Sequence, residues 1–173
     1  MDFGRYVACI CEGAAERAIL DLLLDADKLI FNRDMLLDNE IIKDRKAESF
    51  ERKYLGKGFE EKITVLRILD SRKEKFRLSE AYEVQVKVIN VITAPEIEKL
   101  IILNENRYDD FNKLKNVKPS EYCKGNLKYK NVKSYEFVKN YFGDIDKLLK
   151  AIKKYKSKSD VKKGEYTLCD LLK

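Results

Sequence analysis

Acidic side chains follow the apolar stretches of this sequence at four separate places. These carboxylates, each within three residues of the end of an apolar stretch, are Glu12, Asp34, Asp70, Glu96 and Glu98. Clustered carboxylates raise one another's pKa unless a cation neutralises them, and hard oxygen ligands suit Mg²⁺ or Mn²⁺. If the four stretches end at one place, the pattern predicts a Mg²⁺ or Mn²⁺ site. Glu12, Asp70 and Glu96 are its catalytic candidates, and Asp34 is a further ligand. A metal held there would polarise a phosphoryl oxygen and activate water.

The alternative is a capping role, because acidic residues are favourable in the first turn of a helix. Glu12 taken alone fits such a role, and Gly13 would let the chain turn tightly from strand into helix. Acids at all four ends favour a shared site, although 30 acidic residues in a chain of 173 make a coincidence easy. Both interpretations stay open from the sequence.

Alternating strands and helices must position these acids. Apolar and β-branched runs predict strands over 5–11, 29–31, 62–71 and 86–95. Helical patterns or turns are predicted over 14–26, 32–58, 79–85 and 95–106, the last with Pro95 at its first position. This alternation predicts the α/β class: a small parallel sheet with helices on both faces, whose strand ends converge on one crevice.

The last third of the chain is predicted to be helical and basic. Helices are expected over 108–116, 132–142 and 144–156, and the third has an apolar face with lysines on the others. Pro119 and Gly125 mark loops, and residues 165–173 are expected to close the chain as a strand or a docking helix. We therefore expect an α/β core over 1–106 and a lysine-rich helical extension over 107–173 that packs on it.

Basic residues accompany the predicted acidic crevice. Arginine offers a bidentate match to phosphate, so we expect phosphate or nucleic-acid contacts from Arg33, Arg72, Lys73 and Lys75. The competing hypothesis is that Arg33 and Arg72 pair with the acids and neutralise the crevice without metal. The chain would then be a non-catalytic accessory subunit that binds nucleic acid or protein.

Charge is distributed unevenly along the chain. Residues 111–163 hold 16 lysines against five acidic residues, a net charge of +11, whereas the remainder carries −5. This asymmetry suits a protein that brings carboxylates to a polyanion such as nucleic acid. Tyr129 and Lys130 are candidates for base stacking and phosphate contact. Aromatic residues that anchor helices, with lysines facing water, are the alternative.

Composition excludes several classes of site. Histidine is absent, which excludes His-based triads and His metal ligands. The four cysteines lack zinc spacing, and unpaired thiols in an apolar strand favour a reducing, cytoplasmic location. No apolar run approaches the roughly 20 residues of a membrane span, and we see no secretory signal, so no membrane partner is expected.

A strand that runs into Glu12-Gly13 and a helix, with Asp70 after a later strand, resembles the toprim domain of topoisomerases, primases and OLD-type nucleases. The segment CEGAAE, with Glu16 four residues after Glu12, is similar to the EGxxE motif of the OLD-type and RloB-like branches. FNRD is similar to the DRD-type motif of RloB-like proteins with Asn32 in place of the first acid. APEIEKLIIL resembles their proline-acid-aliphatic segment.

This resemblance covers roughly residues 5–105. It implies a metal-dependent nuclease in a phage-defence or restriction setting, with nucleic acid and possible defence subunits as partners. Glu12 would be the acid-base or metal-linked residue, supported by Gly13, Glu16 and Glu98, and Asp70 the first acid of a DxD pair. Arg72 stands where the second acid belongs, which implies a degenerate site with a weak or single metal, or binding without cleavage.

Overall fold

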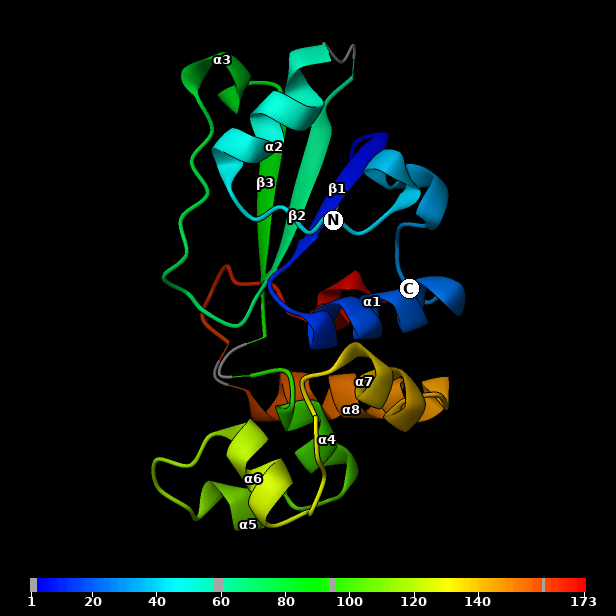
Figure 1. Ribbon diagram of the computed structural model, residues 1–173, viewed down its shortest axis with the longest axis vertical. Coiled ribbons are helices and arrows are strands. Elements are labelled where there is room, and N and C mark those ends of the chain that lie inside the picture. The colour runs from blue at the N-terminus through cyan, green and yellow to red at the C-terminus, as the bar shows by residue number, and fades with distance from the viewer. Residues whose placement is uncertain (1–2, 58–60, 94–95, 160) are drawn as a thin grey trace.

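A parallel three-stranded sheet in the order β1-β2-β3 forms the upper half of the molecule as it is seen in Figure 1. The computed structural model describes residues 3–57, 61–93, 96–159 and 161–173. The strands are β1 (Tyr6–Cys11), β2 (Ile63–Leu69) and β3 (Val86–Ile92). Their nearly continuous apolar residues are typical of parallel strands, which are usually buried on both faces. The strands all point toward a layer of helices below them in Figure 1.

Helices from both halves of the chain cover one face of the sheet. Here α1 (Ala14–Asp25) packs against α7 (Tyr135–Tyr141), and α4 (Lys99–Asn104) packs against α8 (Ile145–Lys158). Every second strand residue points into this core, namely Val7, Cys9, Cys11, Leu66, Ile68, Ile89 and Val91. The helices predicted after residue 106 therefore share a core with α1 and the sheet.

The other face of the sheet has a smaller core. Phe50 and Tyr54 of α2 (Ala47–Tyr54) pack there against alternate residues of β1 and β2. The chain after β2, residues 70–79, returns along the sheet without regular structure to α3 (Glu80–Glu83) (Figure 1). The β3 part of this face is less covered, and Val88 is 36% exposed.

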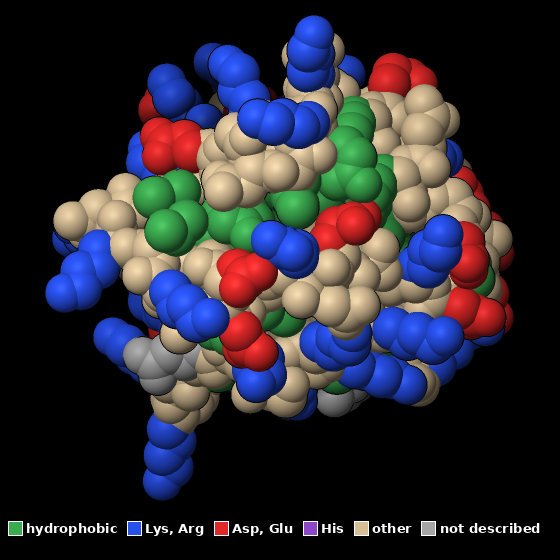
Figure 2. Space-filling view, turned by 90° about the horizontal axis from the view of Figure 1, so that it is seen from below, with side chains coloured by type: hydrophobic (Ala, Val, Ile, Leu, Met, Phe, Trp, Pro, Cys, Tyr) green, Lys and Arg blue, Asp and Glu red, His purple; other side chains and the backbone are tan. Residues whose placement is uncertain are grey.

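Two short helices, α5 (Tyr108–Asn112) and α6 (Pro119–Gly125), complete the helical half. Lysine and arginine side chains are spread over the face seen from below, with acidic side chains among them (Figure 2). The chain ends in a 3₁₀ turn, Leu168–Leu171. Among the described residues, no helix combines the length and apolarity needed to span a bilayer.

The predicted strand over 29–31 is wrong, since Leu29 forms only an isolated antiparallel bridge with Leu172. The predicted helix over 32–58 is also wrong in its first half. Leu36 and Ile42 form parallel bridges to Val7 and Ile10 of β1. These bridges supply hydrogen-bond partners to backbone groups on the outer side of β1. Edge pairing outweighs helix propensity there, and α2 begins only at Ala47.

The loop predicted around Pro119 and Gly125 is wrong as well, because these residues begin and end α6. Proline is well suited to the first position of a helix, where its missing N–H removes no hydrogen bond. Pro95 and Gly58, which were expected to mark element boundaries, lie outside the described residues.

Candidate active site at the carboxyl ends of the strands

Glu12 and Asp70 lie together at the carboxyl end of the sheet. Cys11 is opposite Ile68 in the parallel register, so the residues that follow β1 and β2 emerge side by side. The Asp70 backbone N–H donates to Glu12 Oε2 at 3.0 Å. Burial raises the pKa of Glu12 from 4.5 to about 7, and the side chain and charge of Asp70 add to this rise, whereas the bond from the Asp70 backbone N–H opposes it.

Glu16, in the first turn of α1, folds back over Gly13. A Cβ at Gly13 would lie 2.7 Å from Glu16 Oε2, so glycine leaves room for this carboxylate. Gly13 itself is extended, with φ −136° and ψ 178°, and needs no left-handed conformation. Burial raises the pKa of Glu16, against the stabilising N–H groups of Glu16 and Gly13, and the charge of Asp70 adds to the rise. Glu16 therefore bonds to the backbone N–H groups at the start of α1 and also lies close enough to Asp70 to interact with its charge.

Glu96 and Glu98 approach the same place from the chain after β3. Burial raises the pKa of Glu98 to about 7, with contributions from Glu96 and Glu16. Glu96 accepts the backbone N–H of Ser120 at 3.0 Å and the Lys133 ammonium at 3.3 Å. Burial disfavours its charge, but these partners outweigh burial and lower the pKa of Glu96. Glu96 therefore ties α6 to the sheet end.

Two cations that the sequence analysis did not single out contact these acids. Arg45 NH1 lies 3.4 Å from Glu12 Oε1 and donates to the Glu12 backbone oxygen at 3.2 Å. Lys133 pairs with Glu96, and its charge also acts on Glu98 and Asp70. Arg45 reaches Glu12 because the Ile42 N–H bonds to Cys9 O at the edge of β1. The β-branched pair before Lys43 was the signal for this extended segment.

Asp34 and Arg33 lie away from this cluster. Asp34 is exposed and lines a cavity together with Tyr6, which begins β1, so it lies at the opposite end of that strand from Glu12. Arg33 donates to Asp21 and Asp25 of α1, at 2.9 and 2.5 Å. No strand forms over 29–31 to bring these residues to the crevice.

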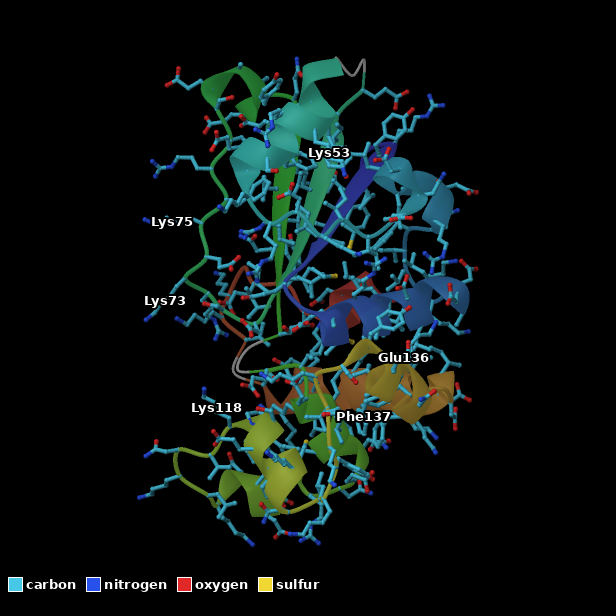
Figure 3. The ribbon with its side chains drawn as sticks, viewed as in Figure 1. Lys53, Lys73, Lys75, Lys118, Glu136 and Phe137 are labelled. Atoms are coloured by element: carbon cyan, nitrogen blue, oxygen red, sulfur yellow. The ribbon has the colours of Figure 1, made fainter. Side chains whose placement is uncertain are left out.

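Arg72 and its lysine neighbours follow Asp70. Arg72 donates to both carboxylate oxygens of Glu165, at 2.6 and 2.9 Å, and this pairing lowers the pKa of Glu165 to about 2. Lys73 and Lys75 point away from the sheet into solvent (Figure 3). Their position leaves both ammonium groups accessible to a ligand beside Asp70.

Tyr129 is used for packing. Its hydroxyl donates to Glu105 at 2.9 Å, and its ring packs against Phe137 and Tyr141 with centroids 5.7 and 5.5 Å apart. Lys130 is exposed. These contacts favour the anchoring interpretation of Tyr129 over base stacking.

A cavity of about 240 Å³ lies beside Glu12. Its lining comprises Cys11, Glu12, Gly13, Ala14, Arg17, Ile41, Ile42 and Lys43. Two cationic residues and the positive end of the α1 dipole thus border a space next to the Glu12 carboxylate. The cavity offers room for a small anionic group.

The Glu12 and Asp70 pair has the donor chemistry of a Mg²⁺ or Mn²⁺ site. Mg²⁺ commonly takes one or two carboxylates and keeps several waters. Within the described residues, no three carboxylate or thiol side chains are grouped closely enough to hold a metal ion together. The pair therefore fits a hydrated cation better than one enclosed by protein ligands.

Comparison of the chain with protein-family models, with curated proteins and with solved structures gives no match. The contacts of the site are therefore the basis for a functional proposal.

Proposed function

We propose that this chain is a nucleic-acid-associated protein whose Glu12 and Asp70 bind Mg²⁺ or Mn²⁺ and support cleavage of a phosphodiester. The meeting of these two carboxylates from neighbouring strands carries the proposal. Neighbouring like charges repel each other, and a divalent cation would relieve that repulsion. The EGxxE resemblance adds a phage-defence setting, with a partner subunit as part of the same proposal.

Glu12 and Asp70 would hold the metal, which when bound would polarise a phosphoryl oxygen. With its pKa near 7, Glu12 is able to hold or release a proton at neutral pH. Arg45 is half-exposed, so it is free to turn from Glu12 toward a phosphate. Glu96 has a positioning role in this proposal, because its oxygens are engaged by Ser120 and Lys133.

Residues 70–79, which we call the basic strap, would guide the substrate. The side chains of Lys73, Lys75 and Arg77 are exposed. The alternate residues Phe76 and Leu78 pack against the smaller core, which contains Phe50 of α2. Alternation along an extended chain thus places three cations in a row that begins beside Asp70. Such a row suits the phosphates of a flexible single strand.

The first test is Mn²⁺ and Mg²⁺ titration calorimetry on wild type, Glu12→Gln and Asp34→Asn. We expect metal binding that E12Q weakens at least about tenfold, because one of two charged ligands is lost. D34N is the matched control, since Asp34 lies at the other end of β1, and it should bind as wild type does. Binding unaffected by E12Q would refute the metal site. If binding is lost, Mn²⁺-dependent cleavage of a labelled oligonucleotide tests the nuclease step.

A non-catalytic nucleic-acid-binding role is the second candidate, and the contact of Arg45 with Glu12 favours it. In that case a single-stranded oligonucleotide should bind equally well in EDTA, and K73A/K75A should weaken it several-fold. The control is K53A, on α2. Fluorescence anisotropy at two salt concentrations measures this, and equal binding by K73A/K75A would exclude the strap as the contact.

A further inference from the structure

Among the described residues, the first part of the outer edge of β3 has unpaired backbone groups. The Ile92 N–H donates outward to Tyr166 O at 2.8 Å, whereas the Thr93 N–H donates inward to Leu69 O at 2.7 Å. Backbone groups alternate in direction along a strand, so those of Val86, Val88 and Asn90 also point outward. The parallel bridge of Val91 with Tyr166 engages the Asn90 C=O as well as the Ile92 N–H. Within the described part of the chain, no backbone partner lies on the outer side of Val86, of Val88 or of the Asn90 N–H.

Apolar side chains gather at the same edge. Val84 is 83% exposed, Tyr166 41% and Val88 36%. Among the described residues, Leu114, in the helical half, is the remaining large apolar residue that is exposed. Val84 and Val88 flank the start of β3, and Tyr166 lies beside its end. Proteins normally blunt or cover such an edge, because its free N–H and C=O groups are a template for another chain.

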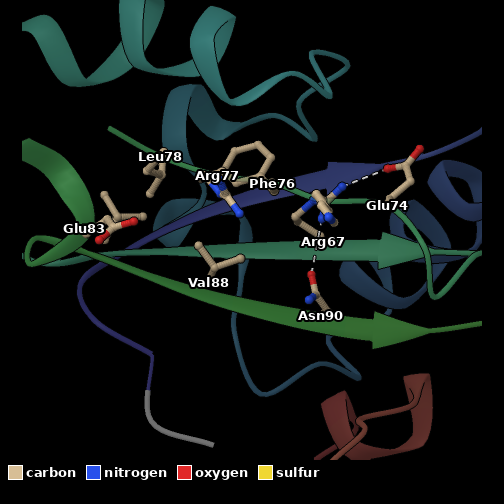
Figure 4. A pocket seen from close by; sticks show the side chains of 10 residues that line it. Arg67, Glu74, Phe76, Arg77, Leu78, Glu83, Val88 and Asn90 are labelled. Carbon is tan, nitrogen blue, oxygen red and sulfur yellow. Dashed lines mark hydrogen bonds and ion pairs between the residues drawn. The ribbon is translucent and has the colours of Figure 1, made fainter. Parts of the chain in front are cut away.

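A groove runs along this edge between β3 and the basic strap. One cavity of about 580 Å³ is lined by strap residues and by Val86, Val88 and Asn90 (Figure 4). A second, of about 440 Å³, is lined by residues 87–90 and by Gly164, Glu165 and Tyr166. Both hollows include Glu74, Val88 and Asn90, so together they follow the strand from α3 to Tyr166.

The far end of the edge already accepts an extended chain. Tyr166 pairs in parallel with Val91, and the segment is held there by the Glu165 to Arg72 ion pair. Outward backbone groups require an occupant that presents matching N–H and C=O groups at the same spacing. An extended peptide does so, whereas a nucleic acid does not.

We propose that the β3 edge between Val86 and Asn90 binds an extended peptide segment of a partner protein by strand addition. Main-chain hydrogen bonds to Val86, to Val88 and to the Asn90 N–H would supply affinity. Alternate apolar side chains of the peptide would pack on Val88 in the groove. This surface shares Lys75 and Arg77 of the basic strap with the proposed nucleic-acid path, but it includes neither Glu12 nor Asp70, so strand addition does not depend on the metal site.

The test is selection of a displayed library of random 12-residue peptides on the full chain, followed by calorimetry with the enriched peptides. Val88→Pro removes one outward N–H without breaking a bond to β2, and Leu114→Ala is the control for an exposed apolar residue elsewhere. Strand addition predicts enriched peptides with alternating apolar residues, bound at least about tenfold more weakly by V88P and unchanged by L114A. N-methylation of alternate peptide residues should have the same effect, which keeps the test valid if V88P folds poorly.

Failure to enrich any peptide would overturn the proposal, as would peptides that tolerate N-methylation at every position. Light scattering provides the remaining check. A wild-type dimer that V88P converts to a monomer would assign the edge to a second copy of this chain instead.

Discussion

Neighbouring groups shift the pKa values of Glu12 and Glu96 in opposite directions, although both residues follow strands at the carboxyl end of the sheet. Burial beside Asp70 raises the pKa of Glu12 to about 7. At Glu96 the Ser120 N–H and the Lys133 ammonium outweigh burial, so its pKa is lowered. At the residue scale, Glu12 is therefore a group that titrates near neutral pH, whereas Glu96 is a structural contact between the sheet and α6.

Glu12→Gln should change how stability depends on pH. The folded-state pKa of about 7 lies above the ordinary 4.5, so wild type loses stability as pH rises from 4.5 through 7. E12Q cannot ionise and should exceed wild type by roughly 1–2 kcal/mol at pH 8, with little difference near pH 4. Urea unfolding in EDTA measures this, with the exposed Glu48→Gln as control. A difference that is the same at both pH values would contradict the raised pKa.

Gly13→Ala tests the space that glycine leaves for Glu16. The backbone at Gly13 suits alanine, but the new Cβ would lie 2.7 Å from Glu16 Oε2 and displace that carboxylate. We expect a loss of roughly 0.5–1 kcal/mol, which should vanish when Glu16 is also replaced by alanine. Unfolding of the four proteins of this double-mutant cycle gives the coupling. Additive effects would show that Gly13 has another role.

At the element scale, an ion pair holds the segment 164–167 against β3. Glu165 pairs with Arg72, and its pKa of about 2 lies below the ordinary 4.5. The stabilisation is therefore present above pH 4.5 and is lost as pH falls toward 2. Glu165→Gln should cost roughly 1 kcal/mol at pH 7 and much less at pH 2.5, with the exposed Glu136→Gln as control. Faster amide exchange at Ile92 should accompany the loss, and an unchanged rate there would argue against this docking role.

At the scale of the whole molecule, the last third of the chain is built into the main core. Leu148 of α8 is fully buried in the cluster that contains Val7 and Leu66 of the sheet. Leu148→Ala should cost about 2–5 kcal/mol and reduce amide protection in β2 as well as in α8. The exposed Lys150→Ala should remain within about 0.5 kcal/mol of wild type. Loss of protection in α8 alone would mean that the two regions unfold independently.

Local patterns in the sequence predicted the elements whose residues carry their own signal. Residues 5–11 and 62–71 read as strands because their apolar runs fit burial on both faces, and the amphipathic spacing after Asp144 predicted α8. The meeting of Glu12 with Asp70 followed from strand ends in a parallel sheet. This prediction required no knowledge of contacts, because neighbouring parallel strands have their carboxyl ends on the same side of a sheet.

Other features depended on groups far apart in the chain. Residues 32–46 do not form the predicted helix, because Leu36 and Ile42 pair instead with backbone groups on the outer side of β1. That choice moved Asp34 away from the site and brought Arg45 to Glu12.

Taken alone, the sequence determined the strand-helix alternation, the carboxylates at the strand ends and the lysine-rich last third, because each depends on residue type and short-range spacing. Only the tertiary structure decided which charges neutralise one another, that Glu96 is tied to Ser120, and that the outer side of Val86 and Val88 has no backbone partner among the described residues. Those outcomes depend on distances between segments that sequence spacing does not encode, and burial then sets the energy of each charge.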